Sequence, residues 1–211
     1  MNGEAPGFSP GEEVTSRAGQ SAHSRKRAGC LARGQRAKSS KREGNGTVRV
    51  IHGDFLEGLR DPDGIVLAST CGVITRGGRL VMGAGAARAL AHRFSGLADE
   101  FGRLVRLSGV FRGDHWVYGL VVTTYRGYLV GAFQTKGHWR DPSSLDLVRF
   151  SASKLGRYLE ANPDIRVHMA YPGIGLGGLG QEDVSRVLEE ELGPVLTRVS
   201  LYILPRGTLH I

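Results

Sequence analysis

Two kinds of apolar segment alternate along the chain from about residue 47 onward, and this alternation constrains the fold more than any other feature. Short runs rich in β-branched and aromatic residues predict strands, whereas longer segments with apolar residues at three- and four-residue spacing predict helices. The predicted strands are residues 48–51, 65–68, 116–122, 128–133, 165–169 and 199–204, and the predicted helices are residues 84–94, 97–107, 145–159 and 182–192. Strands separated by helices indicate an α/β domain in which helices cover both faces of a sheet.

The first 46 residues differ in composition from the rest of the chain. They contain 9 Lys and Arg and 4 Asp and Glu, whereas residues 47–211 contain 19 and 16. Their few large apolar residues cannot offset the entropy of ordering the segment. We therefore expect a disordered basic tail over residues 1–46 and one folded domain over residues 47–211. Such a tail can contact nucleic acid weakly through phosphates, and the alternative is a solvated tail without a dedicated target.

The composition also excludes several classes of protein. The 2 cysteines cannot build a disulfide framework or a four-cysteine zinc site, so we expect no metal. No apolar run approaches the about 18 residues of a membrane-spanning helix. The first residues lack the apolar centre of a signal peptide. We therefore expect a cytoplasmic protein without a membrane anchor.

Two glycine-rich segments each follow a predicted strand and precede a predicted helix, which favours a phosphate-binding site. The first, residues 69–87, contains Gly83 and Gly85 where its helix starts, and the second, residues 171–180, contains five glycines from Gly173 to Gly180. Glycine lets the backbone turn its N–H groups toward an anion, and a helix N-terminus adds partial positive charge. The first segment lacks both the Walker and the dinucleotide motif, so we expect backbone groups to hold the ligand without an obligatory lysine or magnesium ion. For the second segment, the alternative is a flexible turn that only connects two elements.

A third segment, residues 134–141, combines groups that suit a sugar or a base beside a phosphate. It contains Lys136, His138, Trp139 and Asp141. A lysine or histidine here could position water or stabilise charge during hydrolysis, and the alternative for His138 is a hydrogen-bonding surface residue. For Trp139 we expect packing against the core.

Taken together, these motifs resemble those of the macrodomain, the ADP-ribose-binding module, over residues 48–204. Residues 53–55 resemble the Gly-Asp-apolar step after the first strand, and residues 82–85 and 173–179 resemble the two phosphate loops. Residues 133–145 resemble the corresponding segment of the branch that includes DNA-directed ADP-ribosyl glycohydrolase antitoxins. The resemblance implies a three-layer α/β/α fold around a central mixed sheet, with ADP-ribose as ligand and no cofactor.

The resemblance also implies which residues bind the ligand. The carboxylate of Asp54 would accept a hydrogen bond from the adenine amino group, and the two glycine loops would hold the diphosphate and the distal ribose. The implied ligand-binding residues are Asp54, Phe55, Thr70, Met82, Gly83, Ala84, Gly85, Thr135, Gly173, Ile174, Gly175, Leu176, Gly177, Gly178 and Leu179.

Two departures from the family pattern concern catalysis. Ala84 stands where the resemblance to the antitoxin branch implies a lysine, and residues 69–72 replace the Asn-Ala-Ala-Asn stretch of other macrodomain hydrolases. An alanine offers neither an amine nor a charge to the anomeric carbon. We also expect Cys71 to be a packed side chain rather than a nucleophile, because no partner base can be assigned to it.

The sequence therefore leaves four candidate functions. The first three are given in decreasing order of support, and the fourth is not ranked. The first is binding of ADP-ribose, either free or attached to DNA or protein. The second is hydrolysis of such a linkage, with Lys136, His138 and Asp141 as candidate catalytic residues. The third is nucleic-acid binding through the basic tail. A fourth is the processing of a related nucleotide, such as a phosphorylated ADP-ribose.

Overall fold

The structure, a computed structural model, describes residues 48–203, and the tail expected at residues 1–46 lies outside this range. Its main sheet has six strands in the order β1-β8-β7-β2-β6-β5. These are β1 (Arg49–His52), β8 (Val199–Ile203), β7 (Arg166–Ala170), β2 (Gly64–Cys71), β6 (Tyr128–Lys136) and β5 (Leu120–Tyr125). All neighbouring strands are parallel except β5 and β6, which are antiparallel. The sheet is therefore mixed, as the resemblance implied.

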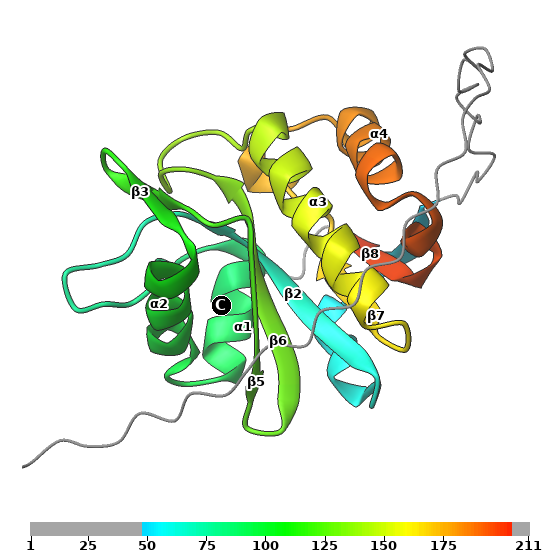
Figure 1. Cartoon of the computed structure of the whole chain (residues 1–211), viewed down its shortest axis with the longest axis horizontal. Helices are drawn as coiled ribbons and strands as arrows, with labels where there is room; N and C mark the ends of the chain where they lie inside the picture. Colours follow the sequence, from blue (N-terminus) through cyan, green and yellow to red (C-terminus); the bar gives the residue numbers. More distant parts are fainter. Residues whose placement is uncertain (1–47, 204–211) are drawn as a thin grey trace, which may run out of the picture. The chain divides into compact units, whose positions relative to one another are not determined.

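Helices cover both faces of this sheet, which gives three layers (Figure 1). The helices are α1 (Gly85–Arg93), α2 (Leu97–Ser108), α3 (Leu145–Ala161) and α4 (Gln181–Leu192), with the 3-10 helices η1 (Phe55–Arg60), η2 (Gly175–Gly177) and η3 (Gly193–Arg198). Helices α1 and α2 pack with Val66 and Ala68 of β2, whereas α3 and α4 pack with Ile65 and Leu67. Because successive residues of a strand point to opposite faces, the continuous apolar run in β2 supplies both cores.

One predicted strand is interrupted in the structure. Instead of a single strand over residues 116–122, the chain forms β4 (His115–Val117) and then β5, and β4 pairs with β3 (Val110–Arg112) in a separate hairpin. The break lies at Gly119, which has a φ of 73°. There the side-chain Oε1 of Gln134 accepts hydrogen bonds from the N–H groups of Tyr118 and Gly119, at 2.9 and 3.1 Å. A side chain thus takes the place of a strand neighbour for these two donors.

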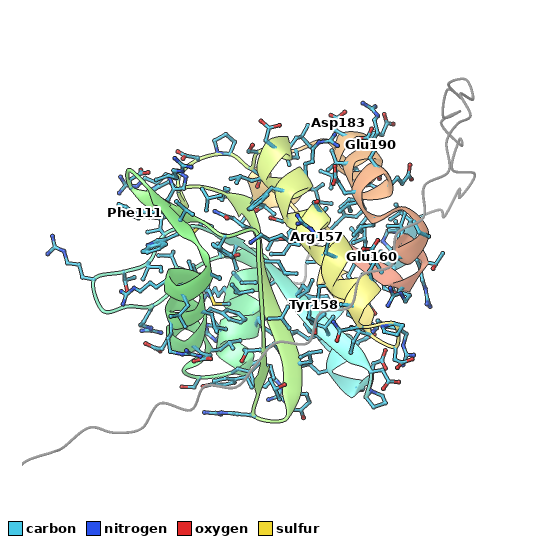
Figure 2. The ribbon with its side chains drawn as sticks, in the orientation of Figure 1. Phe111, Arg157, Tyr158, Glu160, Asp183 and Glu190 are labelled. Atoms are coloured by element: carbon cyan, nitrogen blue, oxygen red, sulfur yellow. The ribbon has the colours of Figure 1, made fainter. Side chains whose placement is uncertain are left out.

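The hairpin carries an exposed aromatic side chain. Phe111 on β3 is labelled at the edge of the molecule in Figure 2, and its ring lies 5.4 Å from the ring of Trp116 on β4. The sequence analysis missed β3, because a strand of 3 residues is too short to show a period.

The predicted helices agree with the structure to within about two residues at each end, the usual difference between assignments. Helix α3 begins with a side-chain cap, since the hydroxyl of Ser144 accepts a hydrogen bond from the N–H of Leu147. Within residues 48–203, no helix is long and apolar enough to cross a membrane. The same part of the chain contains no group of three or more His, Cys, Asp or Glu side chains placed to hold a metal ion.

Candidate functional site

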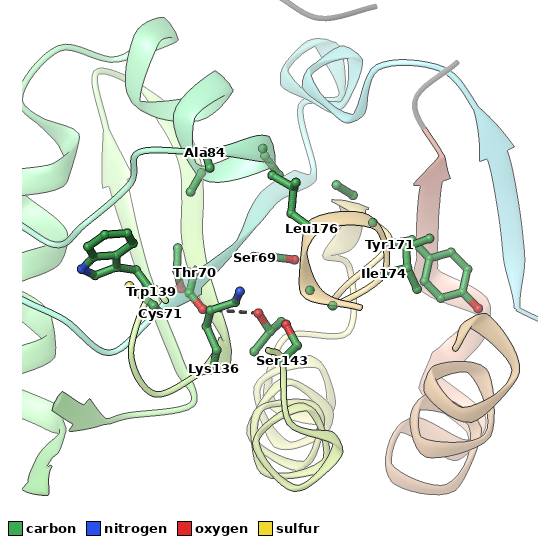
Figure 3. Close-up of a pocket in the computed structure, with 18 of the residues that line it drawn as sticks. Ser69, Thr70, Cys71, Ala84, Lys136, Trp139, Ser143, Tyr171, Ile174 and Leu176 are labelled. Carbon is green, nitrogen blue, oxygen red and sulfur yellow. Dashed lines mark hydrogen bonds between the residues drawn. The ribbon is translucent and has the colours of Figure 1, made fainter. Parts of the chain in front are cut away.

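A pocket of about 720 Å³ lies at the C-terminal edge of the parallel strands. The last residues of β2, β6, β7 and β8 all line it, namely Cys71, Lys136, Ala170 and Ile203. Ligands of open α/β sheets bind at this edge, because the loops that leave the strands converge there. Figure 3 shows the pocket between the loop that carries Ala84, the segment after β6 and the loop that carries Leu176.

The first glycine loop brings the start of α1 to this pocket. Gly83, Ala84 and Gly85 line it, and Ala84 is the N-cap residue with an extended backbone. No side chain caps the helix, so its first N–H groups are left for another acceptor. A Cβ added to Gly83 would meet no atom within 4 Å, which means that a ligand can approach the backbone here.

The second glycine loop lines the pocket with residues 173–177. It is closed by backbone hydrogen bonds from Gly178 to the carbonyl of Gly175 and from Leu179 to the carbonyl of Gly173, both 3.0 Å. The N–H groups of Gly175 and Leu176 are not donors in these bonds. The sequence analysis expected the start of α4 to contribute as well, but no residue of α4 lines the pocket.

Ten of the fifteen implied ligand-binding residues line the pocket: Thr70, Gly83, Ala84, Gly85, Thr135, Gly173, Ile174, Gly175, Leu176 and Gly177. Asp54, Phe55, Met82, Gly178 and Leu179 do not. The side chains of Phe55 and Met82 belong to the core below α1, with exposed fractions of 0% and 8%, so only their backbones could meet a ligand. The carboxylate of Asp54 caps η1 by accepting a hydrogen bond from the N–H of Leu56 at 2.9 Å.

The three candidate catalytic residues separate in the structure. Lys136 lines the pocket, whereas His138 and Asp141 do not. The ammonium group of Lys136 donates a hydrogen bond to the backbone carbonyl of Asp141 at 2.8 Å, and Nδ1 of His138 accepts one from the N–H of Arg140 at 3.2 Å. No Asp, Glu, His or Arg side chain lines the pocket within the described range, so Lys136 provides its only formal charge there.

The prediction that Trp139 packs in the core was wrong. Its side chain lines the pocket and is 50% exposed. The guanidinium group of Arg140 lies 4.6 Å from the centre of its ring, and the ring of His138 lies 5.5 Å away. Because a loop connects β6 to α3 here, the apolar ring lies at the rim of the cavity and not between the layers.

A buried hydrogen-bond network supports the end of β2. The hydroxyl of Tyr118, which is fully buried, lies 2.5 Å from Oγ1 of Thr70 and 3.2 Å from the carbonyl oxygen of Cys71. Burial raises the pKa values of Tyr118 and of the Cys71 thiol, so both groups are neutral. A protonated thiol that donates to the carbonyl of Val81 is a packed group, in agreement with the expectation for Cys71.

The sequence analysis did not select several residues that line the pocket. Ser69 and Ser143 lay within segments that it described, but their hydroxyls were not singled out as ligand groups. Tyr171 and Tyr202 present their rings, because the hydroxyl of Tyr171 is bonded to Ser185 of α4 and that of Tyr202 lies 2.9 Å from Nδ1 of His168. No sequence signal marks Tyr202, which reaches the pocket only because β8 lies between β1 and β7.

Comparisons with known proteins identify the fold through solved structures. No protein-family model matches the sequence, and no curated protein matches it. Solved structures do match. The macrodomain of Thermus aquaticus DarG is 23% identical, with a TM-score of 0.55 over 74% of this chain and 97% of that one. The macrodomain of Mycobacterium tuberculosis DarG is also 23% identical, with a TM-score of 0.52 over 75% and 98%.

A third structure, Thermosipho africanus DarTG in complex with ADP-ribose, is 19% identical with a TM-score of 0.56, and the match covers 74% of this chain and 41% of that one. Identities this low establish the fold alone. The mixed sheet between two helical layers and the pocket at its C-terminal edge agree with that result. The described part of the chain has the macrodomain fold.

Proposed function

We propose that the chain binds ADP-ribose, either free or attached to a macromolecule, in the pocket at the C-terminal edge of the sheet. The observation that carries this proposal is the meeting of two glycine loops, far apart in the sequence, in one cavity. Gly83 and Gly85 come from the loop after β2, and Gly175 and Gly177 come from the loop after β7. Backbone N–H groups at two sides of a cavity suit a ligand with a diphosphate at its centre.

The size and charge of the pocket support the same ligand. A volume of about 720 Å³ falls in the range of about 300–1,000 Å³ that is typical of small-molecule sites. The uncapped start of α1 and the ammonium group of Lys136 both favour an anion. The solved structure of Thermosipho africanus DarTG, 41% of which matches this chain in fold, is a complex with ADP-ribose. The adenine-reading role of Asp54 remains part of the proposal on the family resemblance alone, because Asp54 does not line the pocket and its carboxylate caps η1.

Isothermal titration calorimetry with ADP-ribose, without added metal ions, tests the proposal. Adenosine diphosphate, adenosine monophosphate and ribose 5-phosphate serve as partial ligands. We expect ADP-ribose to bind more tightly than each of them, because each partial ligand lacks at least one of the adenosine, the diphosphate and the distal ribose. Absence of binding at millimolar ADP-ribose to protein with a cooperative thermal transition would reject the proposal.

Hydrolysis is a second candidate function, and the position of Lys136 is the observation that favours it. Its ammonium group is held by the carbonyl of Asp141 at the wall of the pocket, where it can stabilise charge that develops on a leaving oxygen. Ala84, on the facing loop, has no reactive group.

A single-turnover release assay on ADP-ribosylated DNA and protein tests this second function. If Lys136 acts, Lys136→Met abolishes release but leaves ADP-ribose bound, whereas His138→Ala, outside the pocket, does not change the rate. If the chain only binds, release is absent until Ala84→Lys supplies an amine. Release by the unmodified chain that survives Lys136→Met would contradict the assignment to Lys136.

A further inference from the structure

In the described part of the chain, two buried side-chain hydroxyl groups have no hydrogen-bond partner within the protein, and both belong to residues that line the pocket. Within residues 48–203, Oγ of Ser69 and Oγ of Ser143 are the buried side-chain polar atoms in this state. Other buried hydroxyls nearby are paired, such as that of Ser151, which donates to the carbonyl of Gln134 at 2.7 Å. An unpaired buried hydroxyl destabilises a folded protein, so its presence calls for a partner that the chain alone does not supply.

Ser143 is held firmly against the second glycine loop. The residue is 7% exposed, and its N–H group donates to the carbonyl of Gly177 at 2.9 Å. A Cβ on Gly177 would lie closer to Oγ of Ser143 than any van der Waals contact allows, so the absence of a side chain at Gly177 makes room for this hydroxyl. The serine does not cap α3, because that role belongs to Ser144. Neither fold nor capping therefore explains a hydroxyl at residue 143.

Ser69 lines the same pocket. It is part of β2, opposite Phe133 of β6, two residues before the strand ends in Cys71. In Figure 3 its hydroxyl points from β2 toward the loop that carries Ile174 and Leu176. Its neighbour Thr70 has two partners for its hydroxyl, Tyr118 and the carbonyl of Phe133. The adjacent residues of β2 thus differ, since one hydroxyl supports the fold and the other is left for a ligand.

We propose that the hydroxyls of Ser69 and Ser143 donate hydrogen bonds to oxygen atoms of the bound nucleotide, and that Ser143 donates to the diphosphate. This inference rests on the proposed function and names the side chains that read the ligand. Phosphate oxygens only accept hydrogen bonds. The glycines beside Ser143 have no side chain that could donate one, so the hydroxyl of Ser143 supplies a side-chain donor there. Ser69 supplies a second donor from β2.

Paired alanine variants test the proposal. Ser143→Ala removes an unpartnered hydroxyl, so we expect an unchanged or higher melting temperature together with a roughly tenfold loss of ADP-ribose affinity. Ser144→Ala, one residue later, removes a helix cap, so we expect a lower melting temperature and an unchanged affinity. Ser69→Ala should behave like Ser143→Ala, and Ser151→Ala, which loses a paired hydroxyl, should behave like Ser144→Ala.

Titrations with adenosine diphosphate and adenosine identify the contact of Ser143. A loss of affinity for adenosine diphosphate as well as for ADP-ribose, with none for adenosine, supports the diphosphate. A loss confined to ADP-ribose contradicts that assignment. If the unmodified chain binds ADP-ribose and Ser143→Ala binds it equally well, the serine proposal is wrong while the proposed function stands. If the unmodified chain does not bind, the function itself is rejected, and the serine proposal with it.

Discussion

Substitution of Gly83 by valine isolates the contact between the first glycine loop and the ligand. Gly83 does not have a positive φ, and a Cβ there would meet no protein atom within 4 Å. The Cβ of the new side chain would therefore collide with no protein atom, and Gly83 lines the pocket that valine would narrow. Replacing an unstrained glycine also lowers the entropy of the unfolded chain, so we expect the stability to stay the same or rise by about 0.4–1 kcal/mol.

Binding should respond very differently. If the valine keeps the diphosphate from two backbone donors at the start of α1, and each charge-assisted bond contributes about 1.5 kcal/mol, the loss is about 3 kcal/mol. That corresponds to an increase of about 150-fold in Kd, measured by calorimetry with ADP-ribose. The thermal transition of the same sample shows whether the fold has been kept.

The choice of glycine decides whether this experiment can be interpreted. Gly177 lines the pocket too, but its Cβ would collide with Ser143, so Gly177→Val would disturb the loop itself. Gly77→Val is a matched control, because Gly77 is open, has no positive φ and does not line the pocket. A Gly83→Val protein with the Kd and melting temperature of the unmodified chain would show that the first loop does not approach the ligand.

Three further predictions concern other parts of the chain. Asp61 contacts Arg166 and His168, and these contacts hold the pKa of its carboxyl well below its usual value of about 4. The contribution of Asp61 to stability is therefore present above pH 4 and is lost as the pH falls below it. Asp61→Asn should lower the free energy of unfolding by about 1–2 kcal/mol at pH 7, and thermal melts near pH 3 should show a smaller difference. Asp54→Ala should weaken the binding of ADP-ribose by about 1–3 kcal/mol and the binding of its inosine analogue by less. An equal loss of binding for both ligands in calorimetry would contradict the role of Asp54 in reading adenine. Deletion of residues 1–46 should change neither the melting temperature nor the Kd, and a large drop in the melting temperature or a large rise in the Kd would mean that the tail contributes to the domain.

The elements of the fold could be predicted where a local period determines the structure. The run in β2 is apolar on both faces because the strand is central, and the helices show one apolar face each. The prediction failed at residues 116–122, where the apolar pattern continues but the strand does not. The cause is the amide of Gln134, which binds two N–H groups across the sheet. A contact between residues 15 and 16 positions apart leaves no mark on a local pattern.

The site shows the same division between local and tertiary information. Glycine is visible in a sequence as a place where a ligand can approach, so both glycine segments that line the pocket could be selected from the sequence, although not which glycines face the pocket and which face Ser143. Hydroxyls are different, because every serine can donate and accept, and only the folded structure shows which ones already have a partner. Ser143 and Ser144 precede α3 side by side, yet Ser144 caps the helix whereas Ser143 lines the pocket with its hydroxyl unpaired. Two adjacent identical residues therefore have opposite predicted effects on stability and binding, and that difference arises from the packing of a loop 30 residues further along the chain.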